Sequence, residues 1–215
     1  MYIPSQFDQT QLPELHGLIQ QHPLAAIIVA SADGLEANHV PVLLDAARGP
    51  FGTLRGHIAR ANPLWRQVGA GTGVLAVFQG VSHYISPSWY ASKREHGKVV
   101  PTWNYSAVHA RGNIQWFHDL QWLRALLDAT TDHHERHYDK PWRVGDAPAE
   151  FVGHMLGAIV GFEIPIDSLS GKWKLSQNRT ESDRAGIITA LTGQADAAAV
   201  AMAAAIRRAG ERAGD

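Results

Sequence analysis

The sequence contains no cysteine among its 215 residues. Disulfide bonds, thiolate nucleophiles and cysteine-ligated zinc or iron–sulfur centres are therefore excluded. The absence of cysteine is compatible with a reducing compartment such as the cytoplasm.

Long apolar runs are also missing. The longest apolar stretch, from Ala197 to Ile206, consists mostly of alanine and falls far short of the roughly 20 residues that a membrane span needs. The N-terminal segment 1–17 has neither a basic start nor an apolar core, so it does not resemble a signal peptide. We therefore expect a soluble, cytoplasmic protein without a membrane segment.

An excess of positive charge is lacking as well, since the formal net charge is -1. Proteins that hold nucleic acid through its phosphates usually carry a clear positive excess. Contact with DNA would therefore need a local basic patch. The hydrophobic share of 45% and the charged share of 18% are ordinary for a folded globular chain.

The pattern of apolar residues predicts strands in the first 120 residues and again near residue 160, with helices around them. The expected strands are 24–31, 37–45, 51–58, 74–79, 84–87, 103–108, 112–117 and 158–164, with a turn at Asp33-Gly34 and with 103–108 and 112–117 as the two arms of a ribbon. The expected helices are 12–21, 63–69, 120–137, 146–155, 180–191 and 195–208, and segment 91–99 is expected to be a loop. Because strands and helices do not alternate as βαβ units, we expect a mainly β, α+β fold: an antiparallel barrel with peripheral helices.

Two short motifs give weak signals. The glycine-rich GAGTG at 69–73 follows a predicted helix and precedes a strand, which is the reverse of a dinucleotide-binding motif, so we interpret it as a plain loop. His133 and His137 are four residues apart on one predicted helix. No carboxylate completes a ligand set there, so a solvated helix end is favoured and no metal site is expected.

Segment 84–112 has an unusual composition. Its aromatic residues are interleaved with hydroxyl, amide and basic side chains, which a barrel core does not require. A buried polar group without a partner costs about 1–3 kcal/mol. A flavin would account for the mixture, since its ring offers a flat apolar face with polar edges and its phosphate needs cations and donors. From the residues alone, a ligand site and an elaborate core remain equally open.

Five sequence blocks carry a more specific signal. They are MYIP at 1–4, GHIARANPLW at 56–65, FQGVSHYISPSWY at 78–90, VPTWNYSAVHARG at 100–112 and KLSQNR at 174–179. In this order they resemble the PaiB family of FMN-binding negative transcriptional regulators, and the resemblance ends only at the alanine-rich tail. It implies an FMN-binding split β-barrel over residues 1–170. Residues 171–215 would form a C-terminal motif and helices packed on the barrel or the dimer.

The resemblance further implies a homodimer with two FMN sites at the subunit interface. By this comparison, His57, Arg60 and Asn62 would lie near the FMN phosphate, and the backbone at His39 and Val40 near the isoalloxazine. The ring or the ribityl chain would meet Thr102, Trp103, Asn104 and Tyr105. The partner subunit would supply Lys174, Gln177 and Arg179. Lys93 would either clamp a phosphate or be solvated, and Arg94 is expected to be solvated.

Three functions follow from the resemblance. The first is negative regulation of transcription, for which the sequence contains no convincing helix-turn-helix. The second is an FMN-dependent oxidoreductase of the flavin-reductase or pyridoxamine-phosphate-oxidase kind, with His109 or Tyr105 as candidate proton donors and no identified catalytic residue. The third is heme binding, with His57 or His109 as an axial ligand.

Overall fold

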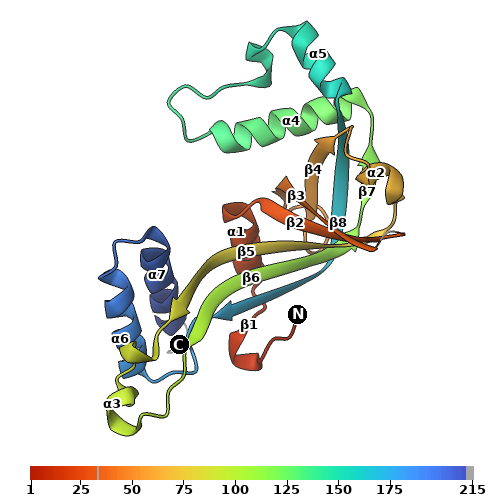
Figure 1. Cartoon of the computed structure of the whole chain (residues 1–215). Helices are drawn as coiled ribbons and strands as arrows, with labels where there is room; N and C mark the ends of the chain where they lie inside the picture. Colours follow the sequence, from red (N-terminus) through yellow and green to blue (C-terminus); the bar gives the residue numbers. More distant parts are fainter. Residues whose placement is uncertain (33, 212–215) are drawn as a thin grey trace. The chain divides into compact units, whose positions relative to one another are not determined.

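The structure is a computed structural model that describes residues 1–32 and 34–211, and it divides the chain into two compact units. Unit 1 comprises Met1–Gln21, Gln79–Val108 and the described part of Ser170–Asp215. Unit 2 comprises His22–Phe78 and His109–Leu169. The strands β5, β6 and β8 contribute residues to both units (Figure 1). The predicted boundary between a barrel at residues 1–170 and a C-terminal part at residues 171–215 stays a prediction.

The described strands form one antiparallel sheet in the order β1-β8-β4-β3-β2-β5-β6. In addition β7 pairs with β8, and β8 pairs with β6, so the sheet closes on itself. The expected antiparallel barrel with peripheral helices is therefore confirmed. The strands are β1 (Asp8–Gln9), β2 (Leu24–Ser31), β3 (Gly34–Asp45), β4 (Thr53–Ala59), β5 (Gly73–Ile85), β6 (Thr102–Asn113), β7 (Gln115–Phe117) and β8 (Ile159–Lys174).

Strand β3 changes its pairing partner in the middle, at Pro41. Gly34 to Pro41 pair with β2, whereas Val42 to Asp45 pair with β4. Proline has no N–H to donate to a ladder, and Pro41 lies just beyond the register that joins β3 to β4. The strand predicted at 37–45 is thus present and begins earlier, at Gly34. Asp33, half of the expected turn, lies outside the described residues.

Strand β6 runs unbroken from Thr102 to Asn113, so the expected ribbon with arms at 103–108 and 112–117 is wrong. Gly112, the first residue of the second predicted arm, lies where the backbone of β8 comes very close. A Cβ atom at this position would meet the carbonyl oxygen of Pro165 at 2.0 Å. Gly112 therefore allows β6 and β8 to approach each other closely, and it does not form a turn.

Two expectations around residues 84–99 are also wrong. Tyr84 and Ile85 do not open a new strand but end the long strand β5. A 3₁₀ turn, η2 (Pro87–Trp89), and a short helix, α3 (Ser92–His96), follow it, where a strand end and a loop were predicted. Gly97 ends α3 in the left-handed conformation, with φ 67°.

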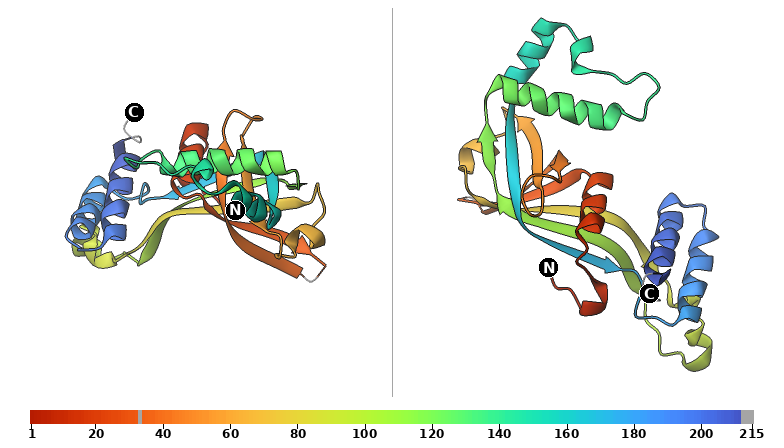
Figure 2. Two further views of the ribbon diagram at one scale, coloured as in Figure 1. Left: turned by 90° about the horizontal axis from the view of Figure 1, so that it is seen from above. Right: turned by 180° about the vertical axis from the view of Figure 1, so that it is seen from behind.

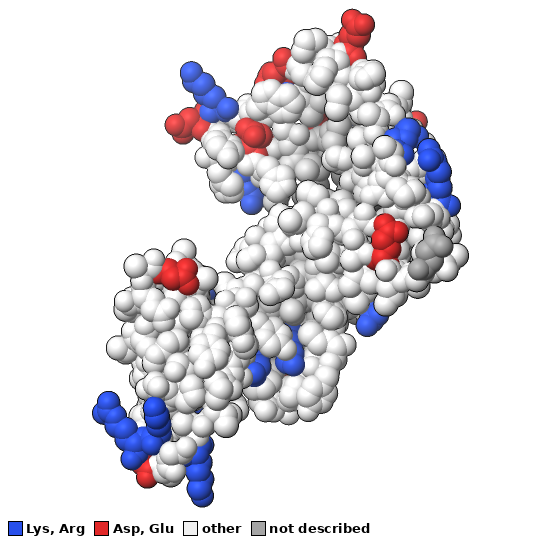
Figure 3. Space-filling view, in the orientation of Figure 1, with Lys and Arg blue, Asp and Glu red and all other residues white. Residues whose placement is uncertain are grey.

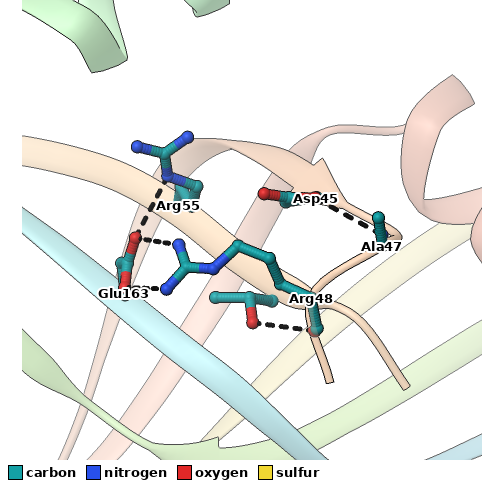
Figure 4. A network of polar contacts seen from close by, with 6 residues as sticks. Asp45, Ala47, Arg48, Arg55 and Glu163 are labelled. Atoms are coloured by element: carbon teal, nitrogen blue, oxygen red, sulfur yellow. Dashed lines mark hydrogen bonds and ion pairs between the residues drawn. The ribbon is translucent and has the colours of Figure 1, made fainter. Parts of the chain in front are cut away.

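The helices of unit 2 pack beside its strands. They are α2 (Leu64–Gln67), α4 (Leu120–Glu135), the 3₁₀ turn η3 (Val144–Asp146) and α5 (Ala149–Gly157). Asp119 caps α4, its side chain accepting the N–H of Trp122 at 2.8 Å. In the same unit, buried Glu163 accepts from Arg48 at 2.5 Å and 3.0 Å, and Nε of Arg55 lies 3.2 Å from it (Figure 4).

The helices of unit 1 include η1 (Ser5–Phe7), α1 (Leu12–Gln21), α6 (Glu181–Thr192) and α7 (Ala197–Glu211). The views of Figures 1 and 2 show α6 and α7 side by side. The alanine-rich helix α7 buries Met202, Ala203 and Ile206 in a shared core with Ile187 and Leu191 of α6. Within the described chain, no helix is both long and apolar enough to cross a membrane.

Candidate functional site

The predicted site residues fall into two sets, one in each unit. Unit 2 contains His39, Val40, His57, Arg60 and Asn62. Unit 1 contains Lys93, Thr102, Trp103, Asn104, Tyr105, Lys174, Gln177 and Arg179. Each set is described within its own unit.

In unit 1, two lysines at the end of β8, Lys172 and Lys174, contact residues at the start of β6. Nζ of Lys174 donates to Oγ1 of Thr102 at 2.5 Å. Two residues earlier on β8, Lys172 is only 9% exposed, and its Nζ lies 5.4 Å from the ring centre of Tyr105 and donates to the carbonyl oxygen of Tyr2 at 3.0 Å. Burial lowers the pKa of Lys174, and the positive charge of Lys172 lowers it further. The two ammonium groups therefore sit among aromatic rings and hydroxyls.

Trp103, the residue after Thr102 on β6, presents an uncovered aromatic surface. Its side chain is 57% exposed, and Tyr84 is 42% exposed. The two rings meet edge to face, with centroids 6.2 Å apart and an interplanar angle of 71°. Because side chains alternate along a strand, Trp103 and Tyr105 leave the same face of β6. This face offers flat apolar area, with the ammonium group of Lys172 against its Tyr105 ring.

Asn104 and Gln177 are engaged within the chain. Asn104 is completely buried, and its Nδ2 donates to Oγ of Ser176 at 2.9 Å. Gln177 accepts from the N–H of Leu175 at 2.7 Å and donates to the carbonyl of Trp173 at 2.5 Å. Both side chains form hydrogen bonds with residues 173–176, at and after the end of β8. Their contact with a ligand stays a prediction.

Arg179 lies over an aromatic ring. Its guanidinium carbon is 4.7 Å from the ring centre of Tyr90, which is 2% exposed. Burial raises the pKa of the Tyr90 hydroxyl, and Arg179 partly opposes this rise. Lys93 is exposed and donates to Oγ of Ser88 at 3.2 Å.

Neither Tyr90 nor Lys172 was nominated from the sequence. Lys172 could have been found because it precedes Lys174 by two residues and so shares its strand face.

In unit 2, Arg60 and Asn62 connect separate segments of backbone. The guanidinium of Arg60 donates to the carbonyl of Gly157 at 2.6 Å and to that of Ile159 at 2.8 Å. Nδ2 of Asn62 donates to Oδ1 of Asn38 at 2.8 Å. Two Arg60 donors are thus satisfied by main-chain oxygens, which leaves fewer of them for a phosphate.

The histidines and Val40 of unit 2 differ in their surroundings. His39 is exposed, whereas Val40 is 5% exposed. His57 is half-buried, and burial lowers its pKa. His109 also has a pKa lowered by burial, and its Nδ1 is buried without a hydrogen-bond partner. Both rings are therefore biased toward the neutral form.

The histidine-rich end of α4 does not have the character of a metal site. Nε of Arg136 lies 2.9 Å from Nε2 of His137, so a cation occupies the position where a ligand set would gather. Across the part of the chain that the structure describes, no group of three or more His, Cys, Asp or Glu side chains is placed to hold a metal ion.

The fold is shared with solved structures. The FAD and heme binding protein from Mycobacterium smegmatis matches with a TM-score of 0.58 and 17% identity, covering 83% of this chain and 78% of that chain. The flavocytochrome Anf3 from Azotobacter vinelandii matches with a TM-score of 0.56 and 14% identity, covering 83% and 75%. At these identities the likeness concerns the fold alone.

Sequence relatives are closer. The protein "Protease synthase and sporulation protein PAI 2" of Bacillus subtilis is 33% identical over 203 residues, which cover 94% of this chain and 95% of that protein. The protein AN0679 of Emericella nidulans is 32% identical over 98% of each chain. Residues 1–168 match the model of a family described as "Putative FMN-binding domain". The chain therefore belongs to this family, the PaiB family that the five sequence blocks predict.

Proposed function

We propose that this protein binds a flavin, FMN, and that the flavin ring lies on the exposed face of β6 in unit 1. The observation that carries the proposal is the uncovered Trp103 ring, which meets Tyr84 edge to face and leaves the same face of β6 as Tyr105. Family membership supports the same ligand class.

The residues present fit such a group. Trp103 and Tyr105 would supply flat aromatic contact for the ring, and such contacts between aromatic rings contribute about 0.5–1.5 kcal/mol beyond the area that they bury. Thr102 and Lys174 would supply donors for its polar edge or side chain, and a hydrogen bond from a charged donor contributes about 1.5–3 kcal/mol. When bound, the flavin would supply hydride or single-electron transfer, and the protein's residues would hold and orient it.

The physiological role that we favour is negative regulation of transcription by a cytoplasmic homodimer, in which Gln177 and Arg179 would reach the partner's flavin. The family resemblance supports this role. Lys and Arg side chains gather over α3 (Figure 3), where Lys93, Arg94 and His96 lie, and this is the local basic surface that DNA contact would need. The alternative is an FMN-dependent oxidoreductase acting on a small molecule.

A second ligand, heme, is favoured by one observation. Burial lowers the pKa of His109, which favours the neutral imidazole, and its Nδ1 is buried without a hydrogen-bond partner. A neutral imidazole nitrogen is an axial ligand of heme iron in many proteins. His57 shares the lowered pKa, so it is the alternative ligand.

Titration of the purified protein with FMN, with hemin in parallel, tests these proposals. Quenched, saturable flavin fluorescence at one FMN per chain is the expected result. A Soret shift with hemin and no response to FMN would show that the ligand is heme and not a flavin. NAD(P)H oxidation by the FMN-loaded protein would favour the oxidoreductase, and salt-dependent DNA binding without turnover would favour the regulator. Sedimentation equilibrium tests the homodimer.

A further inference from the structure

The first half of β3 has a free edge. Residues Gly34 to Pro41 pair on one side with β2. On the other side, β4 pairs only with Val42 to Asp45. Among the strands that the structure describes, β2 and β4 are the neighbours of β3. The outer side of segment 34–41 is therefore covered by none of them.

The pairing register identifies the main-chain groups at this edge. In an antiparallel ladder, residues that exchange hydrogen bonds with the partner strand alternate with residues whose N–H and C=O groups point to the other side. The N–H of Val42 donates to the carbonyl of Pro23 at 2.9 Å, so the even-numbered residues of β3 face β2. Leu35, Ala37 and His39 therefore direct their N–H and C=O groups to the free edge.

This edge lacks the features that keep exposed edges from pairing. Proteins protect such edges with lysine, proline or a bulge. The register with β2 is one-to-one from Gly34 to Pro41, without a bulge. Pro41 lies at the end of the segment, and segment 34–41 contains no lysine or arginine. Its odd-numbered side chains are exposed, Leu35 by 82%. The edge is therefore available to another extended strand.

The charge of Glu36 selects how a second copy of the edge would fit. Two copies of one edge pair antiparallel about a two-fold axis. An axis at Glu36 would place two carboxylates opposite each other, which is destabilising. An axis at Asn38 would place Leu35 opposite Pro41, which has no N–H. An axis at Ala37 avoids both arrangements, because Glu36 then faces Asn38 of the partner subunit.

We propose that the free edge of β3 pairs with the same edge of a second copy of this chain, with the two-fold axis at Ala37. Ala37 then lies opposite its own counterpart, and Leu35 lies opposite His39 of the partner subunit. All three outward residues exchange main-chain hydrogen bonds in this register. The proposal rests on the homodimer of the proposed function and assigns one contact within it.

Single-cysteine variants test the register, because the chain has no cysteine of its own. Opposite residues of a hydrogen-bonded antiparallel pair have Cα atoms about 5.5 Å apart, which is within the range of a disulfide. We expect Ala37→Cys to form a disulfide-linked dimer under mild oxidation, detected by non-reducing electrophoresis and mass spectrometry. Ala30→Cys is the matched control, since Ala30 is an exposed alanine on β2 of the same hairpin. It should not form a crosslink.

Two further variants fix the position of the axis. Leu35→Cys alone should not form a crosslink, because its two copies lie four residues apart along the strands, about 14 Å. The double variant Leu35→Cys/His39→Cys should form one, because these two positions face each other. Crosslinking of Leu35→Cys or Ala30→Cys as fast as that of Ala37→Cys would indicate random collision and would overturn the proposal.

Ala37→Lys tests the contact without a crosslink, since it places two like charges opposite each other at the axis. Sedimentation equilibrium should show a dimer that dissociates about tenfold more readily, whereas Ala30→Lys should behave like the parent protein. If Ala37→Lys stays dimeric and Ala37→Cys forms no disulfide, the homodimer stands and its contact at this edge is overturned. A monomeric parent protein would overturn both proposals.

Discussion

Asn104 and Ser176 exchange two hydrogen bonds inside unit 1. Nδ2 of Asn104 donates to Oγ of Ser176 at 2.9 Å, and the same Oγ donates to Oδ1 of Asn104 at 3.3 Å. Among the described residues, Ser176 is the non-glycine residue with a positive φ, 64°. The pair thus holds a backbone conformation that serine rarely adopts, and it does so two residues after β8 ends and three before Arg179.

Asn104→Ala should lower the free energy of unfolding by about 1–3 kcal/mol, because it leaves the buried Ser176 hydroxyl unsatisfied. The measurement is urea denaturation followed by tryptophan fluorescence. Asn178→Ala is the control, since Asn178 is exposed in the same loop. Equal stability of the two variants would show that the Asn104–Ser176 pair contributes nothing to the fold.

Trp103→Ala should weaken flavin binding by about 1–2 kcal/mol, roughly tenfold, because it removes an exposed aromatic surface from the proposed flavin face of β6. The melting temperature should change little, since the side chain is already 57% exposed. Fluorescence titration with FMN provides the affinity. Trp142→Ala, a tryptophan of unit 2 that is 48% exposed, should bind FMN like the parent protein. If Trp103→Ala binds FMN with unaltered affinity, the flavin ring does not lie on β6.

Glu163→Gln should destabilise unit 2 by about 3 kcal/mol, because it removes the negative charge that two arginines share in a buried position. Arg48→Gln should cost less, about 1 kcal/mol, since the Arg48 side chain is 48% exposed and Arg55 still faces the carboxylate. Thermal and denaturant unfolding of both variants measures the difference. A larger loss for Arg48→Gln would contradict the picture in Figure 4.

Asn62→Ala should lower stability by about 1 kcal/mol, because Oδ1 of Asn62 accepts the N–H of Leu64 at the start of α2 and Nδ2 links to Asn38. Because the resemblance places Asn62 near the FMN phosphate, FMN affinity should fall more than riboflavin affinity. Equal loss for both flavins would show that Asn62 does not lie near the phosphate.

His57 should make stability depend on pH. Burial lowers the pKa of His57 in the folded chain, so the unfolded chain binds more protons once the pH falls below about 6.5. Stability is therefore full above that pH and declines as the pH falls toward the folded-state pKa. Unfolding free energies between pH 5 and 8 should decline less for His57→Gln than for the parent. His109 and His133, whose pKa values are also lowered, contribute in the same direction.

The sequence predicted some elements almost to the residue and missed others for identifiable reasons. The helix at 12–21 and the strand at 24–31 are present with the expected bounds, because each has a clear period and is followed by proline or a turn signal. The ribbon predicted over 103–117 is one long strand, and the partner that Gly112 approaches, Pro165, lies far away in the sequence. The contact of Tyr90 with Arg179 was missed for the same reason, since only the fold brings these two residues together. Lys172 could have been found from its two-residue spacing to Lys174.

The order of the segments in unit 1 has a consequence for its biosynthesis. Helix α1 is synthesised well before one of its partners, since the Leu15 side chain packs against Gly171 of β8. At about 5–20 residues per second, the ribosome needs roughly 8–30 s to add the residues between them. Leu15 therefore gains this contact only after the strands of unit 2 have been synthesised.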